Sequence, residues 1–517
     1  MTGSHRTLSR KHYLEAVSLL LVTESPPNET LAAHGLHADR RERFGRLIGD
    51  GIALIPAAAQ VIRNNDVEHP FRQDSSFYHL TGFDEPDALM LLDPSAAGEQ
   101  YVLFVRPRDR EREIWDGRRA GTEGAKERYG ADASYPVSEF DGVLRRRLVG
   151  RPVVYLPFGN VAFQRRVMGA VRAVGGLANR YGRLVPTEVR DASPHLAELR
   201  LHKTPDEVAR LRIACEITAE GHSEAMRFTR PGHYEYQVQA AMEYIFRARG
   251  ARRDGYPAIV ASGGNSCILH YTDNDRRIAN GDLVLIDAGA EYGYFSADIT
   301  RTFPASGTFS GPQRELYDLV LGAQHAALEL AGPGSTMKQL HQRAVRTMAE
   351  GLVDLGLLPG TAEEAVRMHH YREFFMHGTG HWLGMDVHDA GAYGIEGRPR
   401  PLAPGMAFTV EPGIYVDPER AEVELEMLEF DLDQWMERRM IHGPEKAKEL
   451  EEKERKAAPA IKHQVPVAFR GIGIRIEDDV LITDSGHEIL TAGVPTNPED
   501  VEGLCSEVSA LPYLAPS

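Results

Sequence analysis

The sequence has few cysteines and no long apolar run. Its three cysteines, Cys215, Cys267 and Cys505, lie far apart and show no spacing typical of metal ligands. This argues against a disulfide framework or a thiolate metal site, and it fits a reducing compartment, so we expect a cytoplasmic protein. No stretch approaches the ~18 apolar residues that a membrane span needs, and we expect no membrane partner.

One short apolar run near the start invites comparison with an export signal. Residues 16–22 follow the basic residues Arg6, Arg10 and Lys11, but Glu15 abuts the run and no small-residue cleavage motif comes after it. A signal peptide normally has a longer apolar segment followed by such a motif. We therefore expect a helix at residues 16–22.

Positive charge is also scarce. The chain has 59 Lys and Arg against 75 Asp and Glu, a formal net charge of −16, and no long basic block. A polyanionic partner such as nucleic acid is therefore not expected. The hydrophobic fraction of 42% and charged fraction of 26% are ordinary for a globular enzyme, and 517 residues exceed one ordinary core. Two domains are the default expectation.

The first 190 residues or so alternate short apolar runs with charged, helix-like segments. The segment 123–129 has helical composition. The runs that read as buried strands are 52–55, 88–92, 101–105 and 153–156. This alternation is typical of an α/β domain.

A helix start marks the beginning of the second domain. Thr204 can cap a helix, Pro205 suits its first position, and Glu207 completes a capping box. A break precedes it near residues 191–194. We therefore draw the boundary at residue 194, which predicts an amino-terminal domain over 1–193 and a second domain over 194–517.

Apolar runs that end in acidic residues characterise the second domain. They are 283–286 before Asp287, 405–410 before Glu411, and 472–476 before Glu477. Strands held in a sheet are rigid places to mount ligands, so these carboxylates are candidates for a binding or catalytic site.

One segment, about 419–462, departs from this pattern because it is rich in Glu, Lys and Arg. Opposite charges four residues apart, Glu449 with Lys453 and Glu452 with Lys456, predict a solvated helix within 446–456. We interpret the segment as a surface insertion. An interaction arm or an oligomer contact is the alternative.

Four carboxylates and one imidazole form the most informative set: Asp287, Asp298, His381, Glu411 and Glu477. Each alone is an ordinary turn or strand-end residue. Together, hard oxygen ligands with one imidazole suit Mn²⁺, Co²⁺, Fe²⁺ or Zn²⁺. Four carboxylates converging without metal would repel one another, whereas two divalent cations would neutralise them. Such a pair of ions can activate a bound water.

His377 and His381 have the spacing of a helical zinc pair. However, Gly378 and Gly380 between them disfavour a helix, and no Glu follows the first His. We therefore reject the HExxH interpretation and expect a loop and strand here.

The motifs DAGAEYGYFSADITRTFP, HGTGHWLGMDVHD, VEPGIY and GIGIRIEDD occur in this order. They resemble the Xaa-Pro aminopeptidase (aminopeptidase P) and prolidase group of the pita-bread metallopeptidases. RQDSSFYHLTGFDEPDALMLL and EIWDGRRAG resemble the amino-terminal domain of aminopeptidase P. The resemblance implies a mixed α/β and α+β protein: a small α/β domain followed by a pita-bread domain like those of creatinase and methionine aminopeptidase.

The resemblance also implies a role for each ligand. Asp287 would hold one metal with both oxygens, and Asp298 and Glu477 would bridge the two metals. His381 and Glu411 would complete the second metal's ligands. Glu411 would also act as acid and base on the bridging water.

Five further residues receive roles from the resemblance. His270 and His388 would line the substrate site and stabilise the tetrahedral intermediate, and His377 would contact the proline side of the peptide. Arg475 would hold Asp287, with Tyr415 beside it in a relay near the substrate. The alternative for all five is ordinary packing.

The implied activity is hydrolysis of the bond between an amino-terminal residue and a following proline, by a hydroxide bridging two metals. The implied ions are two divalent cations, Mn²⁺ first, with Co²⁺, Zn²⁺ or Fe²⁺ as alternatives. The implied assembly is a homo-oligomer, a dimer or tetramer. Two other functions stay open: a prolidase that takes only Xaa-Pro dipeptides, and a peptide-binding pita-bread module without catalysis.

Overall fold

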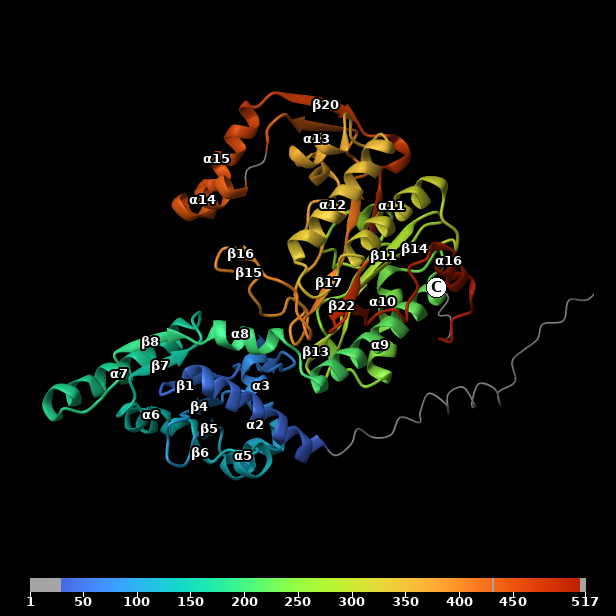
Figure 1. Ribbon diagram of the computed structural model, residues 1–517. Helices are drawn as coiled ribbons and strands as arrows, with labels where there is room; N and C mark the ends of the chain where they lie inside the picture. The colour runs from blue at the N-terminus through green and yellow to red at the C-terminus, as the bar shows by residue number, and fades with distance from the viewer. Residues whose placement is uncertain (1–28, 430–431, 512–517) are drawn as a thin grey trace, which may run out of the picture. The chain divides into compact units, whose positions relative to one another are not determined.

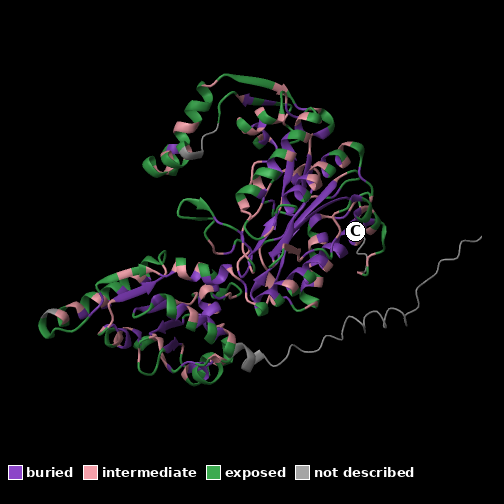
Figure 2. Cartoon of the chain, in the orientation of Figure 1, coloured by how far each residue is buried: buried purple, intermediate pink, exposed green. Residues whose placement is uncertain are grey.

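The computed structural model describes residues 29–429 and 432–511 (Figure 1). The helix predicted at residues 16–22 lies outside this range. The chain forms two compact units that divide between Leu196 and Ala197. Each unit has its own buried apolar core, drawn in purple in Figure 2. Among the described residues, no helix combines the length and apolar character needed to cross a bilayer.

A mixed sheet with strand order β6-β5-β4-β1-β7-β8 forms the centre of the first unit. Its strands are β1 (Ile52–Pro56), β4 (Leu89–Leu92), β5 (Tyr101–Val105), β6 (Ala133–Pro136), β7 (Val153–Leu156) and β8 (Glu188–Asp191). β1 pairs antiparallel with β4 and parallel with β7. The four strands expected from apolar runs are thereby confirmed.

Helices and a small hairpin complete the first unit. They are α2 (Glu29–Ile48), α3 (Ser75–Thr81), α4 (Arg110–Asp116), α5 (Gly121–Tyr129), α6 (Phe140–Leu148) and α7 (Val161–Tyr181), with the hairpin β2 (Ile62–Asn64) and β3 (Val67–Glu68). Phe140 of α6 packs edge-on against Phe104 of β5, with ring centroids 5.1 Å apart. This aromatic contact joins a helix to the sheet inside the unit's core.

The second unit begins within α8 (Ser193–Leu201) and continues into α9 (Pro205–Phe228). Glu207 Oε2 accepts the Thr204 N–H at 2.8 Å, and Thr204 Oγ1 accepts the Glu207 N–H at 3.5 Å. The predicted capping box is confirmed. The other helices outside the charged insertion are α10 (Glu235–Ala248), α11 (Gly311–Leu328), α12 (Met337–Asp354), α13 (Ala362–Arg367) and α16 (Pro498–Ser506).

Antiparallel ladders form the centre of the second unit. They are β10 (Ile259–Ser262) with β11 (Leu283–Ala288) and β14 (Ile299–Pro304), β17 (Ala407–Val410) with β22 (Asp478–Ile482) and β23 (His487–Ile489), and β18 (Gly413–Val416) with β21 (Ile472–Arg475). A bridge between Thr300 and Glu477 links β14 to the segment joining β21 and β22. Residues of α9 to α12 share one apolar core with these strands.

Short strands surround the ladders: β9 (Arg253–Asp254), β12 (Ala290–Tyr292) and β13 (Phe295–Ser296) form one group, and β15 (Gly394–Ile395) and β16 (Arg398–Pro399) form a hairpin. The side chains from Ala392 to Pro399 are exposed. The β15–β16 hairpin is therefore a surface feature.

The charged insertion is a two-stranded ribbon that carries two helices. β19 (Glu422–Glu426) pairs antiparallel with β20 (Ala460–Gln464), and α14 (Leu432–His442) and α15 (Pro444–Ala457) lie between them in sequence. α15 confirms the helix predicted within 446–456. The ion pair formed on this helix joins Lys446 Nζ to Glu449 Oε2 at 2.5 Å, an i,i+3 pair, where the sequence suggested i,i+4 pairs. On an exposed helix face, i,i+3 and i,i+4 partners compete at little cost.

Candidate metal centre

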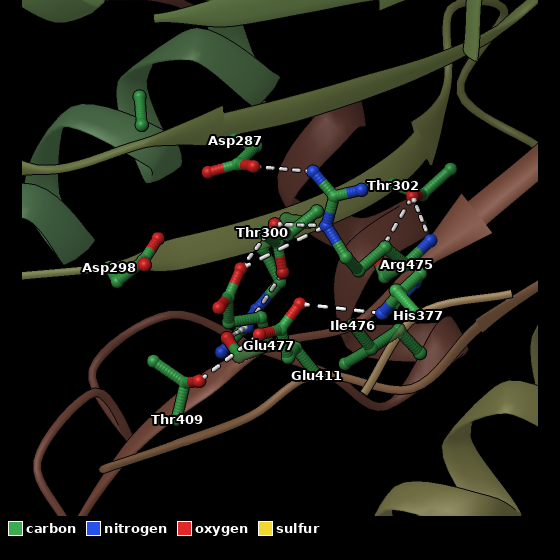
Figure 3. A network of polar contacts seen from close by, with 12 residues as sticks. Asp287, Asp298, Thr300, Thr302, His377, Thr409, Glu411, Arg475, Ile476 and Glu477 are labelled. Carbon is green, nitrogen blue, oxygen red and sulfur yellow. Dashed lines mark hydrogen bonds and ion pairs between the residues drawn. The ribbon is translucent and has the colours of Figure 1, made fainter. Parts of the chain in front are cut away.

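The five predicted ligand residues lie together in the second unit. Figure 3 labels the four carboxylates among them. Asp287 lies in β11, and the register places it opposite Thr300 of β14. The Thr300–Glu477 bridge then brings Glu477 to the same place. Asp298 directly precedes β14, and Glu411 directly follows β17. His381 comes from a loop held beside β17, because Trp382 bridges to Phe408.

The potential ligand atoms are close enough to share a cation. His381 Nε2 lies 3.3 Å from Asp298 Oδ2 and 3.5 Å from Glu411 Oε1. One ligand atom from each of Asp298, His381 and Glu477 lies within 4.8 Å of the others. Ligands about 2.1 Å from a common ion are separated by distances of this size. All five residues line one cavity of about 660 Å³.

Asp287, Asp298 and Glu477 are buried and Glu411 is partly buried, and burial is unfavourable for the charged form of a carboxylate. Burial raises the pKa of Glu411 to about 7, and the negative charges of Asp298 and Asp287 add to the rise. Burial also raises the pKa of Glu477, again with a contribution from Asp298, and that of Asp287. A site of this kind favours cations, which stabilise the ionised carboxylates. The oxygen and imidazole donors fit divalent metal ions.

A chain of polar contacts leads from Asp287 through Arg475 and Tyr415 to His377. Figure 3 shows its first link, between Asp287 and Arg475. The Arg475 guanidinium forms an ion pair with Asp287 and donates to the Tyr415 hydroxyl at 2.9 Å. Burial lowers the pKa of His377 to about 3, so its ring is neutral. His377 Nδ1 lies 2.7 Å from the Gly378 carbonyl and must donate to it. Its Nε2 therefore accepts from the Tyr415 hydroxyl, 2.8 Å away.

The other two predicted histidines lie at the rim of the cavity. His270 and His388 are both exposed and both line it. The ring centroids of His388 and His381 lie 4.2 Å apart, and the two rings meet edge to face. Both imidazoles are therefore accessible to a molecule that enters the cavity.

Three hydroxyl residues that orient the carboxylates were not predicted from the sequence. Tyr256 donates to Asp287 Oδ1 at 2.6 Å and also contacts Asp298. Thr300 donates to Glu477 Oε2 at 2.6 Å. Thr409 donates to Glu411 Oε1 at 3.2 Å. Thr300 and Thr409 each lie two positions from a predicted ligand in an extended chain, and this spacing is a signal that could have found them. Tyr256 has no such signal.

A buried ion cluster around Asp389, the residue after His388, was also not predicted from the sequence. Lys203 Nζ lies 3.1 Å from Asp389 Oδ2, and the Arg200 guanidinium contacts Asp389 as well. Burial opposes ionisation of Asp389, but these two cations hold its pKa below the usual value. The cluster anchors the loop that follows His381 to the end of α8 and to the segment that leads into α9.

Comparison with known proteins identifies the family. The profile of metallopeptidase family M24 matches residues 209–484, and that of the aminopeptidase P amino-terminal domain matches residues 37–155. The chain belongs to metallopeptidase family M24. Membership in this family makes the protein a peptidase that uses divalent metal ions. Its substrates are peptides.

Individual relatives agree with this assignment over nearly their whole length. The chain is 40% identical to the Xaa-Pro aminopeptidase of Haemophilus influenzae over 467 residues, which cover 90% of this chain and 96% of the relative. It is 42% identical to the Xaa-Pro aminopeptidase of Escherichia coli over 453 residues, which cover 87% and 93%.

Solved structures of M24 relatives show the same fold. Pseudomonas aeruginosa aminopeptidase PepP matches with a TM-score of 0.81 and 43% identity, covering 92% of this chain and 98% of that one. Zinc-substituted E. coli aminopeptidase P in complex with product matches with a TM-score of 0.80 and 40% identity, covering 93% and 99%. The expected fold class, an α/β domain followed by a pita-bread domain, is confirmed.

Proposed function

We propose that this M24 peptidase is an Xaa-Pro aminopeptidase, which releases an amino-terminal residue from peptides with proline in second position. The observation that carries the proposal is the cavity in which Asp287, Asp298, His381, Glu411 and Glu477 converge. Two relatives named Xaa-Pro aminopeptidase, similar over both domains, support the choice of substrate.

We assign those five residues as ligands of two divalent ions. Mn²⁺ is the first choice, with Co²⁺, Zn²⁺ or Fe²⁺ as alternatives, because all accept mixed oxygen and imidazole ligands. The raised pKa values of Asp287, Glu411 and Glu477 support cation binding, since a cation would stabilise their ionised forms. When bound, the ions would polarise the peptide carbonyl and lower the pKa of a water.

The remaining chemistry falls to side chains. The bond to proline is a tertiary amide with no N–H. Like any amide nitrogen, the proline nitrogen must gain a proton to leave as a neutral amine. Glu411, which lines the cavity, is placed to accept a proton from the attacking water and pass it to that nitrogen. His270 and His388 at the rim would donate to the carbonyl oxygen as it gains charge.

His377 and its partners would form the proline side of the site. The neutral His377 ring is fixed by the Gly378 carbonyl and the Tyr415 hydroxyl, so it presents a defined surface to the substrate. Arg475 positions both Tyr415 and Asp287. Arg475 thus couples the orientation of a ligand to that of the substrate pocket.

Cleavage of a tripeptide tests the proposal directly. With purified protein and added Mn²⁺, Ala-Pro-Ala should yield Ala and Pro-Ala, and Ala-Ala-Ala should be a poor substrate. A prolidase would cleave Ala-Pro and leave Ala-Pro-Ala intact. A non-catalytic peptide-binding module would cleave neither and would retain no stoichiometric metal after dialysis.

Domain roles, assembly and location complete the proposal. We assign residues 1–193 as an aminopeptidase P-type amino-terminal domain and residues 194–517 as the catalytic domain. We expect a homo-oligomer, a dimer or tetramer. The molar mass measured by light scattering after size-exclusion chromatography would distinguish the two. A cytoplasmic location is consistent with Cys215, Cys267 and Cys505 being free thiols.

A further inference from the structure

A second cavity of about 530 Å³ adjoins the candidate metal centre. Gly378, Gly380 and Tyr393 line both cavities, so the strip 378–380 is their common border. The Glu411 N–H donates to the Thr379 carbonyl at 2.8 Å and holds the strip in place. A Cβ on Gly380 would lie 1.9 Å from the Thr409 carbonyl oxygen, so only glycine fits there. The adjoining cavities give a peptide bound at the carboxylates a second space into which its chain can continue.

The second cavity has walls from three separate elements. The start of α12 provides Met337 and Leu340, the β15–β16 hairpin provides Pro399, and α14 of the charged insertion provides Met436. Met436 is 44% exposed, so part of its side chain is available for contact. Methionine side chains are flexible and polarizable, and they suit surfaces that accept varied apolar groups.

The same walls carry positive charge. Lys338 and Arg398 both line the cavity and are exposed, and within the described part of the chain neither has an acidic partner. The protein as a whole has a net charge of −16. A local pair of cations in an acidic protein favours an anionic group, and the free carboxylate of a peptide is one.

We propose that α14 determines how the enzyme handles peptide length: Met436, with Met337 and Leu340, binds the residues that follow the proline. This inference rests on the proposed function, because it assigns the second cavity to the leaving part of an Xaa-Pro peptide. An extended chain advances ~3.5 Å per residue. A tripeptide therefore enters the second cavity least, and longer peptides gain contact with α14.

Removal of the two insertion helices is the first test. The Met427 N–H donates to the Pro459 carbonyl at 2.7 Å and extends the β19–β20 ribbon by one pair. Replacing residues 428–458 by Asn-Gly therefore closes the ribbon with a two-residue turn that such hairpins favour. The ratio of kcat/KM for a hexapeptide to that for Ala-Pro-Ala should fall, through a higher KM.

A point variant tests the wall without removing an element. Met436→Ala should lower kcat/KM by about fivefold for a hexapeptide with apolar residues after the proline. This factor corresponds to the loss of ~1 kcal/mol of apolar burial. The loss should shrink to less than about twofold on Ala-Pro-Ala. Ile441→Ala is the matched control, because Ile441 is 65% exposed on another side of α14 and does not line the cavity.

The outcomes separate this inference from the proposed function. If Met436→Ala has no effect, or has the same effect on every peptide length, the inference is overturned while cleavage of Ala-Pro-Ala stands. If the Asn-Gly variant changes oligomeric mass but keeps the wild-type ratio of kcat/KM between the hexapeptide and Ala-Pro-Ala, the insertion is an assembly contact and the inference is overturned. If the wild type cleaves Ala-Pro but not Ala-Pro-Ala, the proposed function itself fails.

Discussion

Single side chains at the candidate metal centre act mainly by fixing the orientation of others. The carboxylates of Asp287, Glu477 and Glu411 accept hydrogen bonds from the hydroxyl groups of Tyr256, Thr300 and Thr409. Such contacts fix the lone pairs that face a metal and are a common source of ligand preorganisation. Two predictions follow at this scale, one for a proposed ligand and one for its support.

Glu411→Gln should keep the fold and lose most turnover, with kcat lower by about 10²–10⁴-fold, because the amide cannot accept the proton from water while one oxygen remains to bind. Steady-state kinetics on Ala-Pro-Ala, with the thermal unfolding midpoint as a check on folding, measure the effect. Glu329→Gln, at the exposed position directly after α11, is the control. Near-normal kcat in the Glu411 variant would remove this residue from the mechanism.

Tyr256→Phe should weaken metal binding by about 10–100-fold, because Asp287 loses a 2.6 Å hydrogen bond and Asp298 loses its contact with the same hydroxyl. Calorimetric titration of the metal-free protein with Mn²⁺ gives the affinity. Tyr244→Phe, at a position that is 59% exposed, should bind as the wild type does. Equal affinities in the two variants would show that Tyr256 only fills space.

Whole elements could be predicted where their signals are local. Four of the strands of the first unit, β1, β4, β5 and β7, follow from apolar runs, and the start of α9 follows from a capping box; both signals depend on neighbouring residues. Contacts between residues that are far apart in the chain could not be predicted from the sequence. Tyr256 meets Asp298 only because β10, β11 and β14 form one ladder, and Met436 reaches the second cavity only because of where the ribbon places α14.

The capping box of α9 gives the prediction at this scale. Thr204→Ala should lower the free energy of unfolding by about 1 kcal/mol, because the Glu207 N–H loses its acceptor at the start of a largely buried helix. Urea denaturation followed by circular dichroism measures the change. Thr204→Ser keeps the hydroxyl and should behave like the wild type. An equal loss with serine would show that the threonine methyl group, rather than the cap, is responsible.

For the whole molecule, metal binding should contribute to stability as well as activity. Removing the ions leaves four neighbouring carboxylates that repel one another, and the pKa values of Asp287, Glu411 and Glu477 are raised. EDTA should therefore abolish hydrolysis and lower the thermal midpoint. Adding Mn²⁺ or Co²⁺ should restore both. Full activity in excess EDTA would contradict the metal assignment, and an unchanged midpoint would contradict its structural part.

The ribbon that carries α14 and α15 has a consequence for cleavage by other proteases. The insertion joins the second unit through β19 and β20, and its exposed helices are rich in lysine and arginine. A trypsin cut within α15 would separate Glu411 and Glu477 onto different fragments. The antiparallel pairing of β17 with β22 and of β18 with β21 would still hold these fragments together. A nicked enzyme should therefore co-purify as one particle and keep its candidate metal centre intact.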